Sequence, residues 1–497
     1  MPVLATDFVS FSIMLTFLQV GGWSQVTCTE GWVMLLGKVF ERFASKSAIT
    51  VMMRGALEYA FPPECVDALF RQHAVGQYED NLLFSAVVDV LALAVTGSRK
   101  SVHAAYLASK EELQVSAAAL YDKLQGVETQ VSQALVRESA ARLRPVVTKM
   151  RGQANPLLSG FRVLILDGNH LAATERRVRE TRSQHGVPLP GQALVLLDPQ
   201  TRMMIDVFPC EDAYAQEREL LPQVIETLSR RDLLIADRNF CTTQFVFDIS
   251  EKDAFFLIRQ HASTLSKKRL VGRRARIGET GTGVVYEQAL ETSRRRNGQD
   301  EVLTLRRITI ELFEPTVDGD RQIHLITNLP PDVGALEVAD LYLHRWTIEN
   351  GFQELDQALA SEINTLCYPK AALLAFCVAV VTYNVLSTIK AAIRVAHKEP
   401  ALLTELSGYY LAEEIAATYG GMMIAIEPSQ WTRSFAPLTV DEMAAVMLEL
   451  AANVDPDRFR KRRRGAKKPQ PPRTGGYPHK HVSTARLLHQ RDNPIEA

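Results

Sequence analysis

Cysteine is scarce in this chain: there are six among 497 residues, and none forms a CxxC pair. So few and so widely spaced thiols cannot build the disulfide frame of a small secreted domain or a zinc ribbon. We therefore expect free or buried thiols in a reducing compartment. A Walker-type lysine loop is also missing from the sequence, which argues against a nucleotide hydrolase that uses this phosphate-binding loop.

Long hydrophobic runs are few as well. Residues 8–20 are apolar, but the run is short and lacks the basic start of an export signal. Residues 371–389 are almost long enough to span a bilayer, yet polar side chains occupy their second half. We predict a buried core helix at 371–389, no membrane partner, and a cytoplasmic, nucleoid-associated protein.

The charge is nearly balanced overall but unevenly distributed. Of the 56 Lys and Arg residues, twelve lie in residues 458–491, which contain no Asp or Glu. The other 44 face 57 acidic residues. An acidic body with a basic tail favours a polyanionic partner, with nucleic acid as the leading candidate, although a solvated tail without a partner fits the charge equally well.

The N-terminal third is helical in pattern. Residues 1–60 give no clear fold signal, whereas residues 61–150 have helical spacing of apolar side chains. Ser109 and Ser116 are suitable N-caps for two short helices separated by a turn. This pattern is typical of a helix-turn-helix, but an ordinary helical hairpin explains it equally well.

The pattern becomes α/β after residue 156. Short apolar runs predict strands at 161–167, 192–197, 203–208, 232–237 and 255–259, with helices at 215–229 and 243–251. The first three strands are close enough in sequence for an antiparallel meander, and the later two, separated by helices, should run parallel. This order matches the α/β ribonuclease-H-like fold.

The remaining boundaries follow changes of composition. We assign residues 157–260 to the first part of the core and the polar, Arg-rich residues 261–335 to a β-rich insertion. Residues 336–395 form the second part of the core, beginning with a long helix over 336–359. Residues 396–457 are predicted to be helical, and residues 458–497 form the basic tail.

Three acids stand out on these elements. Asp167 and Asp237 each end a predicted buried strand, where catalytic groups of α/β sheets gather, although a single such aspartate more often caps a turn. Two carboxylates held together repel, so they need a cation, and Mg²⁺ prefers oxygen ligands. Glu349 lies on the long helix, where offsets of three, four and seven place Tyr342, Arg345 and Glu349 on one face. A surface Arg–Glu pair is the alternative there.

These motifs resemble a known family. Asp167, Asp237 and Glu349, with a β-rich insertion before the glutamate, resemble the acids of the DDE transposases of bacterial insertion sequences. Tyr342-x2-Arg345-x3-Glu349 is similar to the start of the Y-R-E-K signature of the IS-four group. Residues 237–240 and 477–486 also resemble that group, and the likeness covers about residues 60–490.

The resemblance implies a metal-dependent enzyme of cut-and-paste DNA transposition. Asp167, Asp237 and Glu349 would hold two Mg²⁺ ions, or Mn²⁺ in their place, about 3.5–4 Å apart. Tyr342 and Arg345 would hold a DNA phosphate. The partners would be double-stranded DNA, both terminal inverted repeats and target, with residues 61–150 binding the ends and a homodimer or larger assembly pairing them.

The chain departs from the family pattern at two points. Asp356 stands where the signature has a lysine, and the Arg294–Arg296 stretch is one source of a compensating cation. Related enzymes can use a tryptophan in the insertion to stack a flipped base, but residues 261–335 contain none. Phe313, Tyr286 and His324 stay open as replacements. The alternatives to an active transposase are a catalytically impaired or domesticated DNA-binding derivative and a host nuclease of the same fold.

Overall fold

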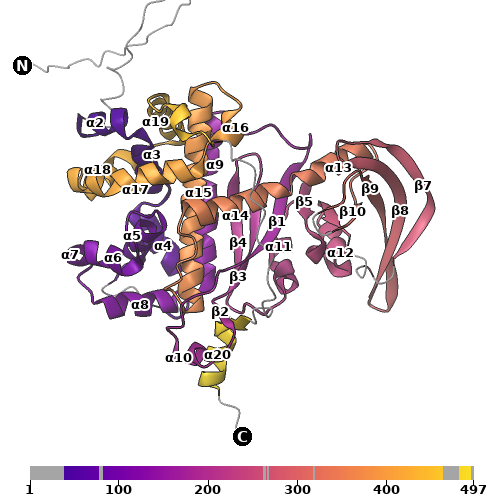
Figure 1. Cartoon of the computed structure of the whole chain (residues 1–497), viewed down its shortest axis with the longest axis horizontal. Coiled ribbons are helices and arrows are strands. Elements are labelled where there is room, and N and C mark those ends of the chain that lie inside the picture. Colours follow the sequence, from indigo (N-terminus) through magenta and orange to yellow (C-terminus); the bar gives the residue numbers. More distant parts are fainter. Residues whose placement is uncertain are drawn as a thin grey trace, which may run out of the picture.

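The computed structural model describes residues 38–77, 82–260, 265, 268–316, 319–462 and 481–493 (Figure 1). The apolar run at 8–20 and residues 463–480 of the predicted tail lie outside this part. An N-terminal helical region precedes a nine-stranded mixed sheet, and further helices follow it. The N-terminal helices are α2 (Lys38–Lys46), α3 (Ala48–Ala60), α4 (Pro63–His73), α5 (Phe84–Val95), α6 (Val102–Ala108), α7 (Lys110–Leu113), α8 (Ala117–Gly126) and α9 (Thr129–Lys149).

The core of the sheet has the predicted strand directions. Its strands are β1 (Arg162–His170), β3 (Gln192–Asp198), β4 (Met203–Cys210), β5 (Asp232–Ala236) and β6 (Phe255–Arg259), in the spatial order β4-β3-β1-β5-β6. β1, β3 and β4 pair antiparallel, whereas β5 runs parallel to β1 and β6 runs parallel to β5. The predicted meander followed by two parallel strands is therefore confirmed.

The predicted β-rich insertion continues this sheet and does not form a sheet of its own. Its strands are β7 (Arg269–Glu279), β8 (Gly283–Arg296), β9 (Gln299–Leu312) and β10 (Gln322–Thr327). β10 pairs antiparallel with β6, and β9, β8 and β7 follow outward to the far edge of the molecule (Figure 1). The alternation of polar and apolar residues predicts strands but does not indicate which strand they will join, so the sequence left this pairing open.

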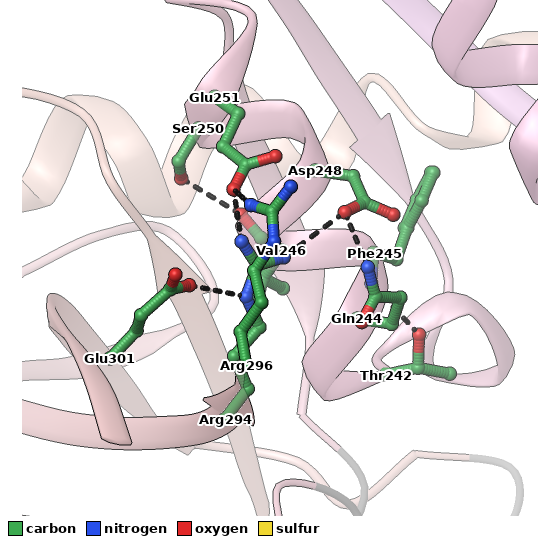
Figure 2. Close-up of polar contacts among 10 residues, drawn as sticks. All are labelled: Thr242, Gln244, Phe245, Val246, Asp248, Ser250, Glu251, Arg294, Arg296 and Glu301. Atoms are coloured by element: carbon green, nitrogen blue, oxygen red, sulfur yellow. Dashed lines mark hydrogen bonds and ion pairs between the residues drawn. The ribbon is translucent and has the colours of Figure 1, made fainter. Parts of the chain in front are cut away.

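One buried arginine fastens the insertion to the helix α12 (Thr243–Glu251) of the core (Figure 2). Arg294 of β8 has a side chain only 8% exposed, and it forms ion pairs with Asp248, Glu251 and Glu301. Its Nη1 lies 3.2 Å from Asp248 and its Nε 2.7 Å from Glu301. Because one guanidinium joins two strands and a helix, the far half of the sheet is held to the core at this point.

Helices cover both faces of the core sheet. On one face lie η1 (Glu217–Leu220), α11 (Leu221–Thr227) and α12, which pack on the even-numbered side chains of β1 and β5. On the other lie α14 (Trp346–Ala358) and the central α15 (Pro369–Ala396), together with α9, whereas α13 (Ala335–Leu343) packs on β7, β8 and β9 of the insertion. The C-terminal helices α16 (Leu402–Glu405), α17 (Gly408–Ala425), α18 (Pro428–Phe435), α19 (Val440–Ala452) and η3 (Pro456–Phe459) complete this layer.

The helix α15 is the buried core helix that its polar second half predicted. By length and composition it could cross a bilayer, but its most apolar 18-residue window is entirely buried within the chain. Asn384 in its middle donates to Ser139 of α9 at 2.7 Å and to the carbonyl of Met204 in β4 at 2.9 Å. The polar residues of α15 therefore join helix to helix and helix to sheet.

Two segments differ from expectation. Residues 38–60, which gave no fold signal, contain α2 and α3, and 11 of the 13 residues of α3 are buried. A helix buried on nearly all sides has no apolar stripe, so periodicity cannot reveal it. At the other end, β11 (His481–Ser483) pairs parallel with β2 (Val187–Leu189), and α20 (Thr484–Asp492) packs on α10 (Arg179–Arg182). The last part of the predicted basic tail is thus folded against the core.

Candidate active site

The pairing of β1 with β5 places two of the predicted acids side by side. The last parallel pair in the register is Leu166 with Ala236, so Asp167 and Asp237 occupy the next positions on neighbouring strands. Side chains alternate along a strand, and both aspartates share the face of Ile165 and Ile235, which packs towards α14 and α15. Asp167 does not end its strand as predicted, because β3 continues to pair with β1 as far as His170.

The third acid reaches the site from α14. The predicted single helix over 336–359 is interrupted, and the chain turns through i to i+3 hydrogen bonds between α13 and α14. The Arg345 amide donates to the Tyr342 carbonyl at 3.1 Å, and the Ile348 amide donates to the Arg345 carbonyl at 3.3 Å. Glu349 consequently falls in the first turn of α14, where the helix dipole favours a negative charge.

Arg345 connects two of the three acids. Its Nη1 lies 3.2 Å from Oδ2 of Asp167, and its Nη2 lies 2.6 Å from Oε1 of Glu349. The side chain is only 11% exposed, so these contacts are poorly screened by solvent. The structure therefore brings Asp167, Arg345 and Glu349 together, as the helical spacing required.

The electrostatics of Asp167 show that Asp237 belongs to the same cluster. Burial raises the pKa of Asp167 to about 6, and the Arg345 guanidinium opposes this rise. The negative charges of Asp237 and Glu349 raise the pKa further. The charges of three carboxylates against one arginine leave excess negative charge in the cluster.

Tyr342 lies at the same point but has no hydrogen-bond partner for its hydroxyl. Its side chain is buried, and burial together with the charge of Asp237 raises the pKa of the phenol. The phenol oxygen is buried and unpaired, and so is Nε of Arg345. Buried polar atoms without partners are costly, so both are available to a ligand that enters the site.

The donor set fits a divalent metal, although the side chains do not yet enclose one. Within the described ranges, no group of three His, Cys, Asp or Glu side chains is arranged to hold a metal ion. Arg345 instead neutralises Asp167 and Glu349 in part. Oxygen-only ligands with excess negative charge suit Mg²⁺ or Mn²⁺, which prefer carboxylates.

Two further acids lie near these strands, and the motifs did not reveal them. Glu217 accepts a hydrogen bond from Asn239, and a side chain at position 168 would collide with its carboxylate, which explains why a glycine follows Asp167. Glu362 accepts from the Ala172 amide at 2.8 Å. Of these residues, only Asn239 lies in a recognisable motif, the Asp-Arg-Asn-Phe segment at 237–240. Both glutamates come from loop or 3₁₀ positions that have no period to read.

Arg294 and Arg296, two residues of the stretch suggested to compensate for Asp356, are already paired with acids. Arg294 is surrounded by acids, and Arg296 pairs with Glu251 at 2.6 Å. Both guanidiniums are therefore committed to holding the insertion on α12 (Figure 2). Asp356 instead has a carboxylate neighbour: burial raises the pKa of Glu362, and the charge of Asp356 adds to the rise.

A basic pocket adjoins the acids on the side of the insertion. It is a cavity of about 730 Å³ on three neighbouring strands, β6, β10 and β9, next to the turn that begins at Arg238. Its charged or titratable lining residues are Arg238, Arg259, Lys268, Arg307, Asp320 and His324. Arg259 pairs with Asp320 at 2.6 Å, whereas Nε of Arg307 is buried without a hydrogen-bond partner.

The lowered pKa of His324 shows that the electrostatic potential in the basic pocket is positive. Burial lowers its pKa to about 4, and the positive charges of Arg307, Arg274, Lys268 and Arg259 lower it further. An imidazole that is neutral at pH 7 beside several cations indicates a site prepared for an anion.

The other two aromatic candidates for base stacking differ in access. The ring of Tyr286 is covered by the Arg274 guanidinium, whose Cζ lies 3.7 Å from the ring centroid. Phe313 is 57% exposed. Trp346, at the start of α14, is 58% exposed and lies beside Arg345, at 5.1 Å from Cζ to the ring centroid.

The residues of this site lie in a segment that is similar to a known protein family. A family model described as the transposase DDE domain matches residues 158–385, which include all three acids, Tyr342 and Arg345. No curated protein matches the chain.

Proposed function

We propose that this chain cuts the ends of an insertion sequence and joins them to target DNA, because residues 158–385 match the model of the transposase DDE domain and that family implies phosphoryl transfer. The IS-four group is the family branch that the Tyr342-x2-Arg345-x3-Glu349 spacing favours. The observation that carries the proposal is the contact of Arg345 with both Asp167 and Glu349, beside Asp237 in the adjacent strand position.

We assign the three acids to metal binding. Asp167 and Asp237 project from neighbouring strands, and Glu349 faces them from α14. Their shared excess of negative charge, evident in the raised pKa of Asp167, would be relieved by a divalent cation. Two bound Mg²⁺ ions would supply Lewis-acid activation of the attacking hydroxyl and stabilisation of the leaving oxygen.

Arg345 and Tyr342 would hold the scissile phosphate. Arg345 would exchange a carboxylate for a phosphate oxygen, because its planar guanidinium can bind either in a bidentate way. Water attacks the phosphorus, the bond to the 3′ oxygen breaks, and that oxygen leaves as a hydroxyl after gaining a proton. The 3′-hydroxyl then attacks a phosphodiester of the target, so one phosphodiester forms as another breaks.

The DNA strand next to the cut would follow the basic pocket. Arg238 adjoins Asp237 directly, and Arg259 lies close enough to Tyr342 to oppose the burial-driven rise of its pKa. A DNA phosphate would accept a hydrogen bond from Nε of Arg307, which is buried without a partner. The helices of residues 61–150 would bind the inverted repeats, and a dimer in the paired complex would present two such sites in the cytoplasm.

The test is a cleavage assay with defined ends. The gene's flanking DNA is searched for inverted repeats, which are cloned on a plasmid and incubated with purified protein and Mg²⁺. Double-strand breaks at the repeat boundaries, dependent on Mg²⁺ and followed by joining to a second plasmid, would support the proposal. Bound but uncut ends would favour a catalytically impaired derivative, and cutting without regard to the repeats would favour a nuclease.

A further inference from the structure

A second concentration of positive charge lies on the far side of the catalytic helix. A cleft of about 710 Å³ is walled by α14, α15, the turn before β4, residues 403–410 and the pair Lys461–Arg462. We call it the rear cleft. Five cationic side chains line it, against a single acidic one: Arg202, Lys390, Arg394, Lys461, Arg462 and the acid Glu354.

The one acid does not balance these cations. Glu354 is paired with Lys390. Arg394 donates only to main-chain carbonyls, those of Gly152 and Gln153. In the part of the chain that the structure describes, no carboxylate forms an ion pair with Arg202, Arg394 or Lys461. Nε of Arg202 and Nε of Arg394 are both buried without a hydrogen-bond partner.

The cations of the rear cleft repel one another, and burial in the protein weakens the solvent screening of that repulsion. Burial lowers the pKa of Lys461, the charges of Lys390 and Arg202 lower it further, and Glu354 opposes them. Burial and the charge of Arg202 also lower the pKa of Arg394. Arg202 and Arg394 are partly buried and form no ion pair with a carboxylate among the described residues, so an anion in the cleft would relieve the repulsion among these cations.

The rear cleft is separate from the site of the acids. Seven residues of α14 line it: Thr347, Asn350, Gly351, Gln353, Glu354, Gln357 and Ala358. Glu349 of the same helix does not line it, and neither does Asp167 or Asp237. The two sites therefore share α14 but present different side chains.

We propose that the rear cleft binds the phosphodiester backbone of a second DNA segment, distinct from the end held at Asp167, Asp237 and Glu349. Two guanidiniums and an ammonium in one cleft suit a ligand with several negative charges, such as a phosphodiester backbone, better than a single carboxylate. The exposed ring of Tyr409 at the rim can contact a sugar or base. The assignment of DNA as the ligand rests on the proposed function.

Arg202→Gln/Lys461→Gln is the variant that tests this site in the full-length protein. Neither side chain makes a hydrogen bond in the structure, and both lose unfavourable repulsion on neutralisation. We expect a melting temperature equal to or above that of wild type in low-salt buffer. We also expect affinity for a random 30-base-pair duplex to fall at least fivefold at about 100 mM salt. The slope of log K against log salt should shrink by about 2, since each lost phosphate contact contributes about 0.9.

The matched control is Lys46→Gln/Lys252→Gln, which removes two exposed lysines outside the cleft. It should change the slope of log K against log salt by less than half as much as the cleft variant does.

Inorganic phosphate serves as the second probe and should raise the melting temperature of wild type more than that of the cleft variant. Retained DNA affinity and slope in the cleft variant would overturn the proposal. Loss of phosphate stabilisation alone would assign the cleft to a small anion, and altered self-association alone would assign it to a second copy of the chain; either result also overturns it. Binding and melting do not depend on cleavage, so their outcome is separate from that of the proposed transposition.

Discussion

The guanidinium of Arg345 lies 3.2 Å from the carboxylate of Asp167, and the same group holds Glu349 at 2.6 Å. The arginine thus places positive charge between two of the three acids. It neutralises them only in part, because the pKa of Asp167 remains raised by burial and by its acidic neighbours. The remaining negative charge favours the binding of cations among these carboxylates.

Replacement of each acid by its amide should separate binding from cleavage. We expect Asp167→Asn, Asp237→Asn and Glu349→Gln each to reduce end cleavage in Mg²⁺ more than about 100-fold, since even partners outside the metal's ligand shell can contribute 10–100-fold. Affinity for the ends should stay within about twofold, because phosphate contacts elsewhere supply most of it. Gel-shift and cleavage assays on the same substrate measure both. Wild-type cleavage by any one variant would remove that residue from the site.

The raised pKa of Asp167 makes stability depend on pH in a specific direction. The folded chain keeps a proton on Asp167 up to about pH 6, whereas the unfolded chain loses it near the ordinary value of 3.8. Stability from this group is therefore present below about pH 4 and lost as pH rises through 6. Without metal at pH 7, Asp167→Asn should unfold with a free energy about 2–3 kcal/mol higher than wild type.

Denaturant unfolding in EDTA at pH 4 and pH 7 measures this difference, with the exposed-site variant Asp332→Asn as control. The two chains should converge at pH 4. Added Mg²⁺ should stabilise wild type but not Asp167→Asn. A variant that is no more stable than wild type at pH 7 would contradict the crowding of negative charge at this position.

His324 should report DNA in the basic pocket. Its neutral state at pH 7 comes from burial and from nearby cations, which hold its pKa at about 4. Bound phosphates would cancel part of that positive potential, so its pKa should rise by about one unit or more when a DNA end is added. NMR titration of the imidazole with and without DNA measures the shift. Arg307→Gln should raise the pKa of free His324 and weaken end binding, whereas an unchanged His324 titration on DNA addition would place the strand elsewhere.

Loss of Arg294 should release the insertion from α12. This guanidinium is 8% exposed and pairs with Asp248, Glu251 and Glu301, so its removal leaves three acids close together (Figure 2). We expect Arg294→Met to lower the free energy of unfolding by about 1–3 kcal/mol, because the arginine is buried whereas its three acidic partners remain partly exposed to solvent. Neighbouring Arg295→Met is the matched control and should change it by less than about 1 kcal/mol. Equal effects in the two variants would mean that Arg294 is not the anchor.

The sequence predicted the strands of the core well because each is a short apolar run whose pattern is independent of its neighbours. It predicted the grouping of Asp167, Arg345 and Glu349 because Asp167 follows a buried apolar run and the offset of four between Arg345 and Glu349 is a local rule, although β1 continues past Asp167 to His170. It could not reveal α3, whose surface is buried on nearly every side, or the docking of β11 on β2, which joins residues nearly 300 positions apart. Glu217 and Glu362 were missed for the same reason: folding, not spacing, brings them to the site.

Asp356 offers the sharpest test of whether this copy is active. It lies two turns beyond Glu349 on α14, about 10 Å along the axis at 1.5 Å per residue, and its side chain is exposed. Its charge adds to the pKa rise of Glu362, so this end of the site is acidic where a DNA phosphate would have to approach. Arg294 and Arg296 cannot offset the charge of Asp356, because both are paired with acids at α12.

We therefore expect Asp356→Lys to raise the rate of end cleavage tenfold or more, about 1.4 kcal/mol in activation free energy. Asp356→Asn, which removes the repulsion without adding a cation, should give an intermediate gain. The gain should diminish with salt, since the charge is exposed to solvent. A lysine variant no faster than wild type, with ends bound equally well, would show that another cation already serves this phosphate.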